Sequence, residues 1–237
     1  MDKIIIYQIF TRLFGNTNTT RKNNGMLDEN GCGKMNNFTP ATLRRIKELG
    51  VTHVWYTGII RHATTTDYST YGIPKQHPAV VKGNAGSPYA ITDYYDVDPD
   101  LAVDVEKRMK EFEALVKRTH KEGLKMIIDF VPNHVARQYK SVAKPEGVVD
   151  FGEDDDTGKQ FSPMNNFYYC PGADFAPDID LYHGCEKPYQ EFPAKATGND
   201  CFSNRPGRND WYETVKLNYG VDYCDAGGIS THFYPTP

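Results

Sequence analysis

The 237-residue sequence contains no apolar run close to the roughly 20 residues that a membrane-spanning helix needs. It also has no basic block, because 27 Lys and Arg are outnumbered by 31 Asp and Glu and the net charge is −4. Neither nucleic acid nor a membrane surface is therefore expected as a partner. Residues 4–6 are apolar but lack the longer apolar region and cleavage site of a signal peptide, so we expect a soluble, cytoplasmic protein.

Two common cofactor and metal motifs are also missing. The cysteines are odd in number, irregularly spaced and without a Cys-x-x-Cys pair, which argues against zinc and favours reduced thiols; they are Cys32, Cys170, Cys185, Cys201 and Cys224. After the apolar run at residues 4–10 the chain continues Thr-Arg-Leu-Phe-Gly instead of Gly-x-Gly-x-x-Gly. A nucleotide-binding sheet is therefore disfavoured, and no organic cofactor is expected.

What the first half does contain is an alternation of strand and helix patterns. Residues 4–10 (IIIYQIF), 51–60 (VTHVWYTGII) and 124–131 (LKMIIDFV) are rich in β-branched and apolar residues, as in parallel strands. We expect the first of them to be buried on both faces. Two helices are predicted between the strands, and two successive crossovers imply a parallel sheet, either doubly wound or closed into a barrel.

The helix boundaries are well marked. Thr39 is a candidate N-cap with proline at the first helical position, and Gly50 supplies a stop. The expected inward face of this helix carries Leu43, Ile46 and Leu49. The second helix is predicted over residues 103–122, with the inward residues Val105, Met109, Phe112, Leu115 and Val116, and with Gly123 as its stop.

Beyond residue 134 the pattern changes. Over a hundred residues are rich in Pro, Gly, Asp and Tyr, and none of them forms a convincing long amphipathic helix. Because such a length is improbable for a plain loop, we interpret residues 135–237 as an irregular inserted subdomain.

Residues 129–134 (Asp-Phe-Val-Pro-Asn-His) resemble the first conserved region of the α-amylase family of glycoside hydrolases. An Asp at a strand end can anchor it by hydrogen bonds, and a neutral His can contact sugar hydroxyls. The resemblance therefore implies structural support from Asp129 and substrate binding by His134. It also implies calcium at Asn133, whose side-chain oxygen suits a hard cation.

Two further segments are similar to the same family. Residues 87–99 (SPYAITDYYDVDP) match a segment after the second strand, in which Tyr89 inherits the role of stacking on the sugar whose bond is cut. Ala90 replaces an aspartate of exo-acting members, which favours cleavage within longer glucans. Asp93, Tyr94 and Tyr95 are interpreted as loop architecture. Residues 49–55 (LGVTHVW) match the second-strand entry, but Gly58 stands where the family usually has proline.

The resemblance implies a partial (β/α)8 TIM barrel of the α/β class, comprising about the first three βα units in residues 1–134. Residues 135–237 would then be the inserted domain before the third helix, with its distal motif at 176–181 or, preferably, 214–219. Eight units need roughly 250 residues before insertions, so a truncated barrel is expected, with an open edge that favours self-association.

No catalytic residue is expected in this chain. The family's nucleophile motif Gly-x-Arg-x-Asp, its acid/base Glu and its third carboxylate have no counterpart, and residues 220–223 (GVDY) lack the arginine. The implied parent is a retaining hydrolase of α-1,4-glucosidic bonds acting on α-glucans or maltooligosaccharides, with this chain inactive by itself. The alternatives are a transglycosylase or phosphorylase of the same clan, or a non-catalytic amylase-like binding module.

Overall fold

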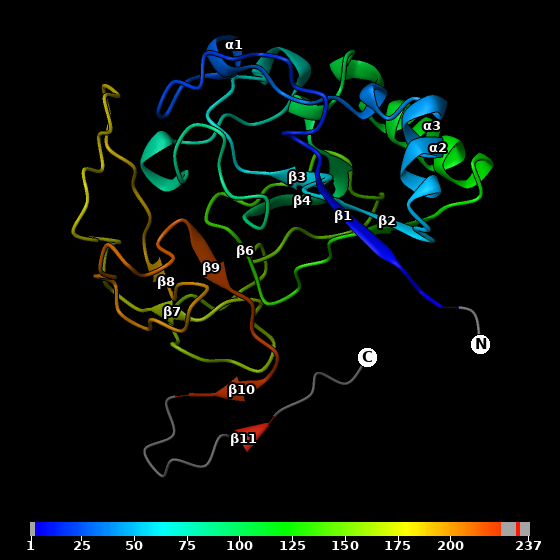
Figure 1. The fold of residues 1–237 in the computed structure, drawn as a ribbon. Coiled ribbons are helices and arrows are strands. Elements are labelled where there is room, and N and C mark those ends of the chain that lie inside the picture. Colours follow the sequence, from blue (N-terminus) through cyan, green and yellow to red (C-terminus); the bar gives the residue numbers. More distant parts are fainter. Residues whose placement is uncertain (1–2, 224–230, 233–237) are drawn as a thin grey trace.

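The centre of the molecule is a three-stranded parallel sheet in the order β1–β2–β5. The computed structural model describes residues 3–223 and 231–232. Its sheet consists of β1 (Ile6–Phe10), β2 (His53–Thr57) and β5 (Lys125–Ile128). The connection from β1 to β2 and the connection from β2 to β5 each contain a helix (Figure 1). This arrangement is a partial TIM-barrel-like α/β fold, as the family resemblance implied, and its parallel sheet is the one that the alternating sequence pattern predicted.

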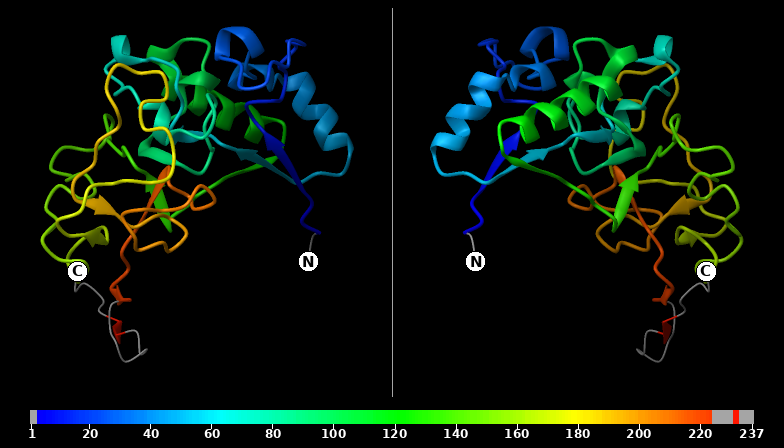
Figure 2. Two further views of the ribbon diagram at one scale, coloured as in Figure 1. Left: turned by 90° about the vertical axis from the view of Figure 1, so that its left-hand side faces the viewer. Right: turned by 90° about the vertical axis from the view of Figure 1, so that its right-hand side faces the viewer.

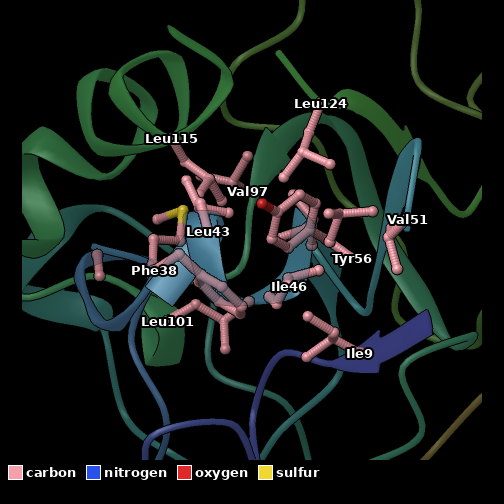
Figure 3. Packing of buried hydrophobic residues seen from close by; sticks show 14 residues of the cluster. Ile9, Phe38, Leu43, Ile46, Val51, Tyr56, Val97, Leu101, Leu115 and Leu124 are labelled. Atoms are coloured by element: carbon pink, nitrogen blue, oxygen red, sulfur yellow. The ribbon is translucent and has the colours of Figure 1, made fainter. Parts of the chain in front are cut away.

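The main core lies between this sheet and two helices. Helices α2 (Pro40–Glu48) and α3 (Arg108–Lys121) cover the same side of the sheet (Figures 1 and 2). Leu43 of α2 and Leu115 of α3 are fully buried against Tyr56 of β2, as Figure 3 shows. The Tyr56 hydroxyl is hydrogen-bonded to the Thr119 hydroxyl at 2.7 Å, so its polar end is satisfied inside the core.

The prediction that the first strand is buried on both faces was wrong. On β1 only Ile9 is buried, whereas Ile6, Tyr7 and Phe10 are exposed. The two helices cover one face of the sheet, and no second layer of described residues covers β1 from the other side. Its apolar residues therefore line an open surface.

The first helix was predicted accurately, whereas the second begins at Arg108 and not at residue 103, and the predicted inward residue Val105 lies in a preceding 3-10 turn. Thr39 is the N-cap of α2, where its hydroxyl accepts a hydrogen bond from Thr42 N at 3.2 Å. Leu49 is not an inward residue: the helix ends at Glu48, Leu49 is the C-cap, and its side chain is 68% exposed. In α3 the inward face is led by Leu115, while Met109 is exposed.

The strand predicted over residues 51–60 is broken by a turn. After β2 the chain turns at Gly58 and continues as β3 (Ile60–His62), which pairs antiparallel with β4 (Ile91–Val97). The connecting segments contain short helical turns: α1 (Leu27–Asn30), η1 (Met35–Asn37), η2 (Ser69–Tyr71), η3 (Pro78–Val80), η4 (Pro99–Leu101) and η5 (Val105–Lys107).

Residues 134–223 contain no helix and are built from short antiparallel pairs. The pairs are β6 (His134–Ala136) with β9 (Thr214–Lys216), β7 (Tyr169–Cys170) with β8 (Ala194–Lys195), and β10 (Val221–Asp222) with β11 (Thr231–His232). A separate apolar cluster around Val135, Phe167 and Val215 holds the first two pairs together. Figure 2 shows this segment beside the sheet, away from α2.

Two expectations from composition concern the whole chain. Cys32, Cys170, Cys185 and Cys201 are free thiols, as expected, and Cys224 lies outside the described residues. Within the described part of the chain, no helix is both long and apolar enough to cross a membrane.

Candidate functional site

Asp129 lies directly after β5 and joins the ends of two neighbouring strands. One carboxylate oxygen accepts a hydrogen bond from Trp55 Nε1 of β2 at 2.7 Å. The other accepts one from the backbone N–H of Gly58 at 2.9 Å. Hydrogen bonds to an ionised acceptor are among the stronger ones in proteins, so this single side chain fixes the edge at which the parallel strands end.

Gly58 explains why this turn departs from the family pattern. Its φ of +82° is a conformation that favours glycine, and an added Cβ would lie 3.1 Å from the Pro88 side chain. Proline has no N–H and a fixed negative φ, so it could not make the hydrogen bond that Gly58 makes to Asp129. Glycine at position 58 therefore allows both the positive φ of this turn and the backbone hydrogen bond to the Asp129 carboxylate.

Tyr89 lies in the loop before β4, close to Asp129. Its ring is 40% exposed, and partial burial together with the Asp129 carboxylate raises the pKa of its hydroxyl. The next residue, Ala90, is buried in a cluster of small side chains with Ala63, Val81 and Ala136. An aspartate at position 90 would place a carboxylate in this apolar cluster, so Ala90 fits the local packing.

His134 begins β6 and contacts the same loop. Its imidazole lies against the Tyr89 backbone, and burial lowers its pKa, with a further decrease from the Lys216 charge. The side chain is 6% exposed, and its Nδ1 has no hydrogen-bond partner in the described structure. The imidazole is therefore neutral at neutral pH, and it supports the surface around Tyr89 while exposing little area of its own.

The structure thus brings together three of the four residues selected from the sequence. Tyr89, Asp129 and His134 gather where the loops leave the carboxyl ends of β2 and β5. Loops at this end of the strands carry the active sites of TIM-barrel enzymes. The roles assigned to the three residues stay predictions, but their placement allows one sugar-binding surface.

Asn133, the fourth residue, is exposed, and its backbone carbonyl oxygen accepts a hydrogen bond from Leu217 N at 3.1 Å. Among the residues that the structure describes, no group of three His, Cys, Asp or Glu side chains is arranged to hold a metal ion. Calcium usually takes six to eight oxygen ligands, often including carboxylates. The surroundings of Asn133 do not supply an acidic shell, and calcium at this position stays a prediction.

Asp93 and Tyr94 have structural roles, but they lie in strand β4 and not in a loop as the sequence interpretation expected. The buried Asp93 carboxylate accepts hydrogen bonds from Ser141 Oγ at 2.7 Å and Val142 N at 2.8 Å. It is also paired with Arg61 at 3.2 Å. The Tyr94 hydroxyl donates to the Val131 carbonyl at 2.5 Å. Both side chains connect β4 to the segments that follow β5.

Two aromatic residues at the site were not selected from the sequence. The Trp211 ring lies 5.3 Å from the His134 ring in an edge-on arrangement and is 42% exposed. The Tyr219 hydroxyl donates to the Pro132 carbonyl. Tyr219 is the last residue of the expected distal motif 214–219, but no role was assigned to it. The only signal for Trp211 was the general abundance of aromatic residues in polar, Gly/Pro-rich stretches.

Comparisons with known proteins agree on one family. The family model described as "Alpha amylase, catalytic domain" matches residues 8–174. The chain is 28% identical to Maltase A2 of Drosophila melanogaster over 170 residues, which cover 68% of this chain and 24% of the relative. It is also 43% identical over 51 residues to an amino acid transporter heavy chain of Rattus norvegicus, covering 22% of this chain and 7% of that protein.

Among solved structures, an α-amylase from Lactobacillus plantarum is 28% identical, with a TM-score of 0.39 over 57% of this chain and 24% of the amylase. The chain therefore spans about a quarter of the length of this amylase and of Maltase A2. The family model covers more than half of the chain, including the strand ends that carry Tyr89, Asp129 and His134. On this evidence the chain belongs to the α-amylase catalytic-domain family.

Proposed function

We propose that this chain provides one wall of the substrate site of an α-glucan hydrolase that cleaves α-1,4-glucosidic bonds with retention. In this proposal residues 1–134 are the N-terminal part of the catalytic barrel, and residues 135–237 are the inserted domain that leads to the third barrel helix. The observation that carries the proposal is the gathering of Tyr89, Asp129 and His134 at the carboxyl ends of β2 and β5.

The chemistry of this wall suits a neutral sugar. The exposed Tyr89 ring offers an apolar surface for the C–H face of a hexose, and its hydroxyl offers a hydrogen bond. His134 is neutral and therefore adds no charge of its own to this wall. The activities named for Maltase A2 and for the L. plantarum α-amylase support an α-glucan as the substrate class.

The preferred assignment of the distal motif to residues 214–219 is supported by the pairing of β9 with β6. Lys216 lies opposite His134, and Leu217 N donates to the Asn133 carbonyl. Residues 176–181 include Leu181, which packs against a different cluster around Phe175 and Tyr189. The segment beside the Asn-His pair is the better candidate.

We propose further that the isolated chain does not hydrolyse its substrate. A retaining glycosidase needs a nucleophile and an acid/base about 5–5.5 Å apart, and the sequence carries neither motif. Asp129 already accepts hydrogen bonds through both oxygens to fix the strand ends. Incubation of the purified chain with soluble starch is expected to release no reducing sugar. Measurable turnover would contradict this proposal.

Binding tests the positive part of the proposal. Isothermal titration with maltoheptaose is expected to detect weak binding, and Tyr89→Ala is expected to weaken it about three- to tenfold, because a ring that stacks on the sugar is lost. Tyr182→Ala is a matched control, since Tyr182 is 53% exposed and lies outside the site. Equal affinity of the two variants for maltoheptaose would show that the Tyr89 ring does not contribute to sugar binding.

Calcium at Asn133 is part of the same proposal and needs a separate measurement. Titration of the metal-free chain with calcium, followed by thermal denaturation, is expected to raise the melting temperature of the natural chain more than that of Asn133→Ala. An equal response of the two chains would place any bound calcium elsewhere. No step of the proposed sugar binding depends on this ion.

A non-catalytic binding module is the second candidate, and the local identity to the transporter heavy chain favours it. A transglycosylase or phosphorylase would use the same wall with a different acceptor. The presence of the Gly-x-Arg-x-Asp motif and the later Glu and Asp in the full gene would exclude the binding module. Product analysis of the full enzyme with maltooligosaccharides would separate hydrolysis from transfer.

A further inference from the structure

The side chain of Trp211 contacts the His134 imidazole, which also lies against the backbone of Tyr89. The imidazole contacts the Tyr89 backbone and, 5.3 Å between ring centres, the Trp211 indole. Although one side of the indole is packed on His134, the residue remains 42% exposed. Trp211 and Tyr89 are thus two half-exposed aromatic residues that approach the same buried imidazole.

The backbone of Trp211 is held in place by a hydrogen-bonded loop. Its N–H donates to Asn199 Oδ1 at 3.2 Å, and Asn199 Nδ2 donates to Asp210 Oδ1 at 2.9 Å. The Trp211 carbonyl accepts from both the N–H and the hydroxyl of Thr214 at 2.9 Å. The backbone that carries the indole is therefore fixed before any ligand binds, which reduces the entropy that binding costs.

Gly198 permits this arrangement. A Cβ at this position would lie 2.4 Å from Thr214 Oγ1 and 2.9 Å from His134 Cβ, closer than real Cβ atoms approach. Only glycine lets the loop that begins at Thr197 pass this close to His134. The contact between Trp211 and His134 thus depends on a local sequence suited to close packing, not on a chance approach of two surface loops.

We propose that Trp211 is a second sugar-stacking residue, which binds a hexose unit of the same oligosaccharide next to the unit on Tyr89. This inference rests on the proposed function, because it names a further specificity-determining residue of that site. The indole supplies a flat apolar face for the sugar C–H bonds. Within the described residues its Nε1–H makes no protein hydrogen bond and can donate to a sugar hydroxyl, whereas Trp55 Nε1 is committed to Asp129.

The chain offers a direct spectroscopic test, because it contains only two tryptophans. A ¹⁵N-labelled sample has two indole N–H signals, and Trp211→Phe identifies the Trp211 signal by its loss. Titration with maltoheptaose is expected to shift that signal. Isothermal titration is expected to show affinity about three- to tenfold lower for Trp211→Ala and a smaller loss for Trp211→Phe, which keeps a ring.

Control variants separate the possible failures. Tyr182→Ala, an exposed aromatic substitution outside the site, is expected to bind as the natural chain does. If the natural chain binds, Tyr89→Ala weakens binding and Trp211→Ala does not, the inference is wrong while the proposed function stands. If the natural chain binds no oligosaccharide and neither indole signal moves, the proposed function itself fails and the inference fails with it.

Discussion

Asp129 shows how much one residue contributes at the ends of these strands. Its carboxylate connects the Trp55 indole of β2 to the backbone of Gly58 and is itself attached to β5. Two hydrogen bonds to the Asp129 carboxylate therefore fix the positions of three chain segments relative to one another. The sequence predicted structural support from Asp129 but not its partners, because Trp55 and Gly58 belong to other motifs and only the folded sheet brings them together.

We expect Asp129→Ala to lower the free energy of unfolding by about 2 to 4 kcal/mol, because two donors to a charged acceptor lose their partner. Urea denaturation followed by far-UV circular dichroism measures this change. Asp154→Ala is a suitable control, since Asp154 is an exposed carboxylate. A loss no larger than that of the control would mean that the two hydrogen bonds contribute little.

His134 couples the stability of the site to pH. Burial lowers the pKa of the folded imidazole below its ordinary value of 6.5, so the unfolded chain binds the proton first as the pH falls. The contribution of neutral His134 is therefore present above about pH 6.5 and is lost as the pH falls through the lowered pKa. Because glutamine is not protonated in this pH range, we expect the stability of His134→Gln to lack this part of the pH dependence.

The measurement is urea denaturation of both chains at pH 7.5 and pH 5.5. The natural chain is expected to lose more stability than His134→Gln on acidification, while carboxylates common to both chains cancel in the comparison. An identical loss in the two chains would show that the imidazole titrates alike in the folded and unfolded states.

At the same scale, Trp211 marks the limit of sequence interpretation. His134 was selected because it stands in a recognisable hexapeptide, whereas Trp211 stands in an irregular segment with no periodicity. Its place beside His134 depends on the pairing of β6 with β9 and on the close approach allowed by Gly198. Long-range pairing of two short strands leaves no local pattern from which it could be predicted.

At the scale of elements, helices were easier to predict than strands. Thr39-Pro40 and Gly50 bracket α2 in sequence and in space, since capping and termination are local interactions. The strand predicted over residues 51–60 failed at Gly58, where a positive φ turns the chain into β3. Apolar composition continued across that turn, so periodicity alone could not reveal it.

Helix α2 provides a test at this scale. Thr39→Ala removes the hydroxyl that accepts from Thr42 N, and we expect it to lower the free energy of unfolding by about 1 kcal/mol. Thr39→Ser retains the hydroxyl and is expected to be nearly neutral. Thermal and urea denaturation of the two variants give the comparison, and equal losses would assign the effect to packing of the threonine methyl group.

At the scale of the whole molecule, the sheet has an uncovered side and an open edge. In the described structure β1 pairs only with β2, and it exposes Ile6, Tyr7 and Phe10. The parallel sheet was predicted from the order of strands and helices, because crossovers fix parallel neighbours, and the partial barrel was predicted from the family resemblance. The exposure of β1 was not predicted, because its apolar run is typical of a strand that is buried on both faces.

We expect this surface to make the chain self-associate. Light scattering coupled to size-exclusion chromatography is expected to show a molecular mass that rises with protein concentration, because an unpaired apolar edge can accept a strand of another copy. Ile6→Lys should reduce association, whereas Leu49→Lys, at an exposed apolar residue that caps the C-terminus of α2, should not. A monomer at all concentrations would contradict the expectation.

The parallel sheet also has a consequence for how the chain reaches its structure. Residue 6 of β1 pairs with residue 53 of β2, and residue 53 pairs in turn with residue 125 of β5. Each pairing closes a large loop, and the entropy of closure is lost before the strand hydrogen bonds form. Folding of this sheet therefore depends on contacts of high sequence separation, and its rate is set by topology more than by the stability of any single helix.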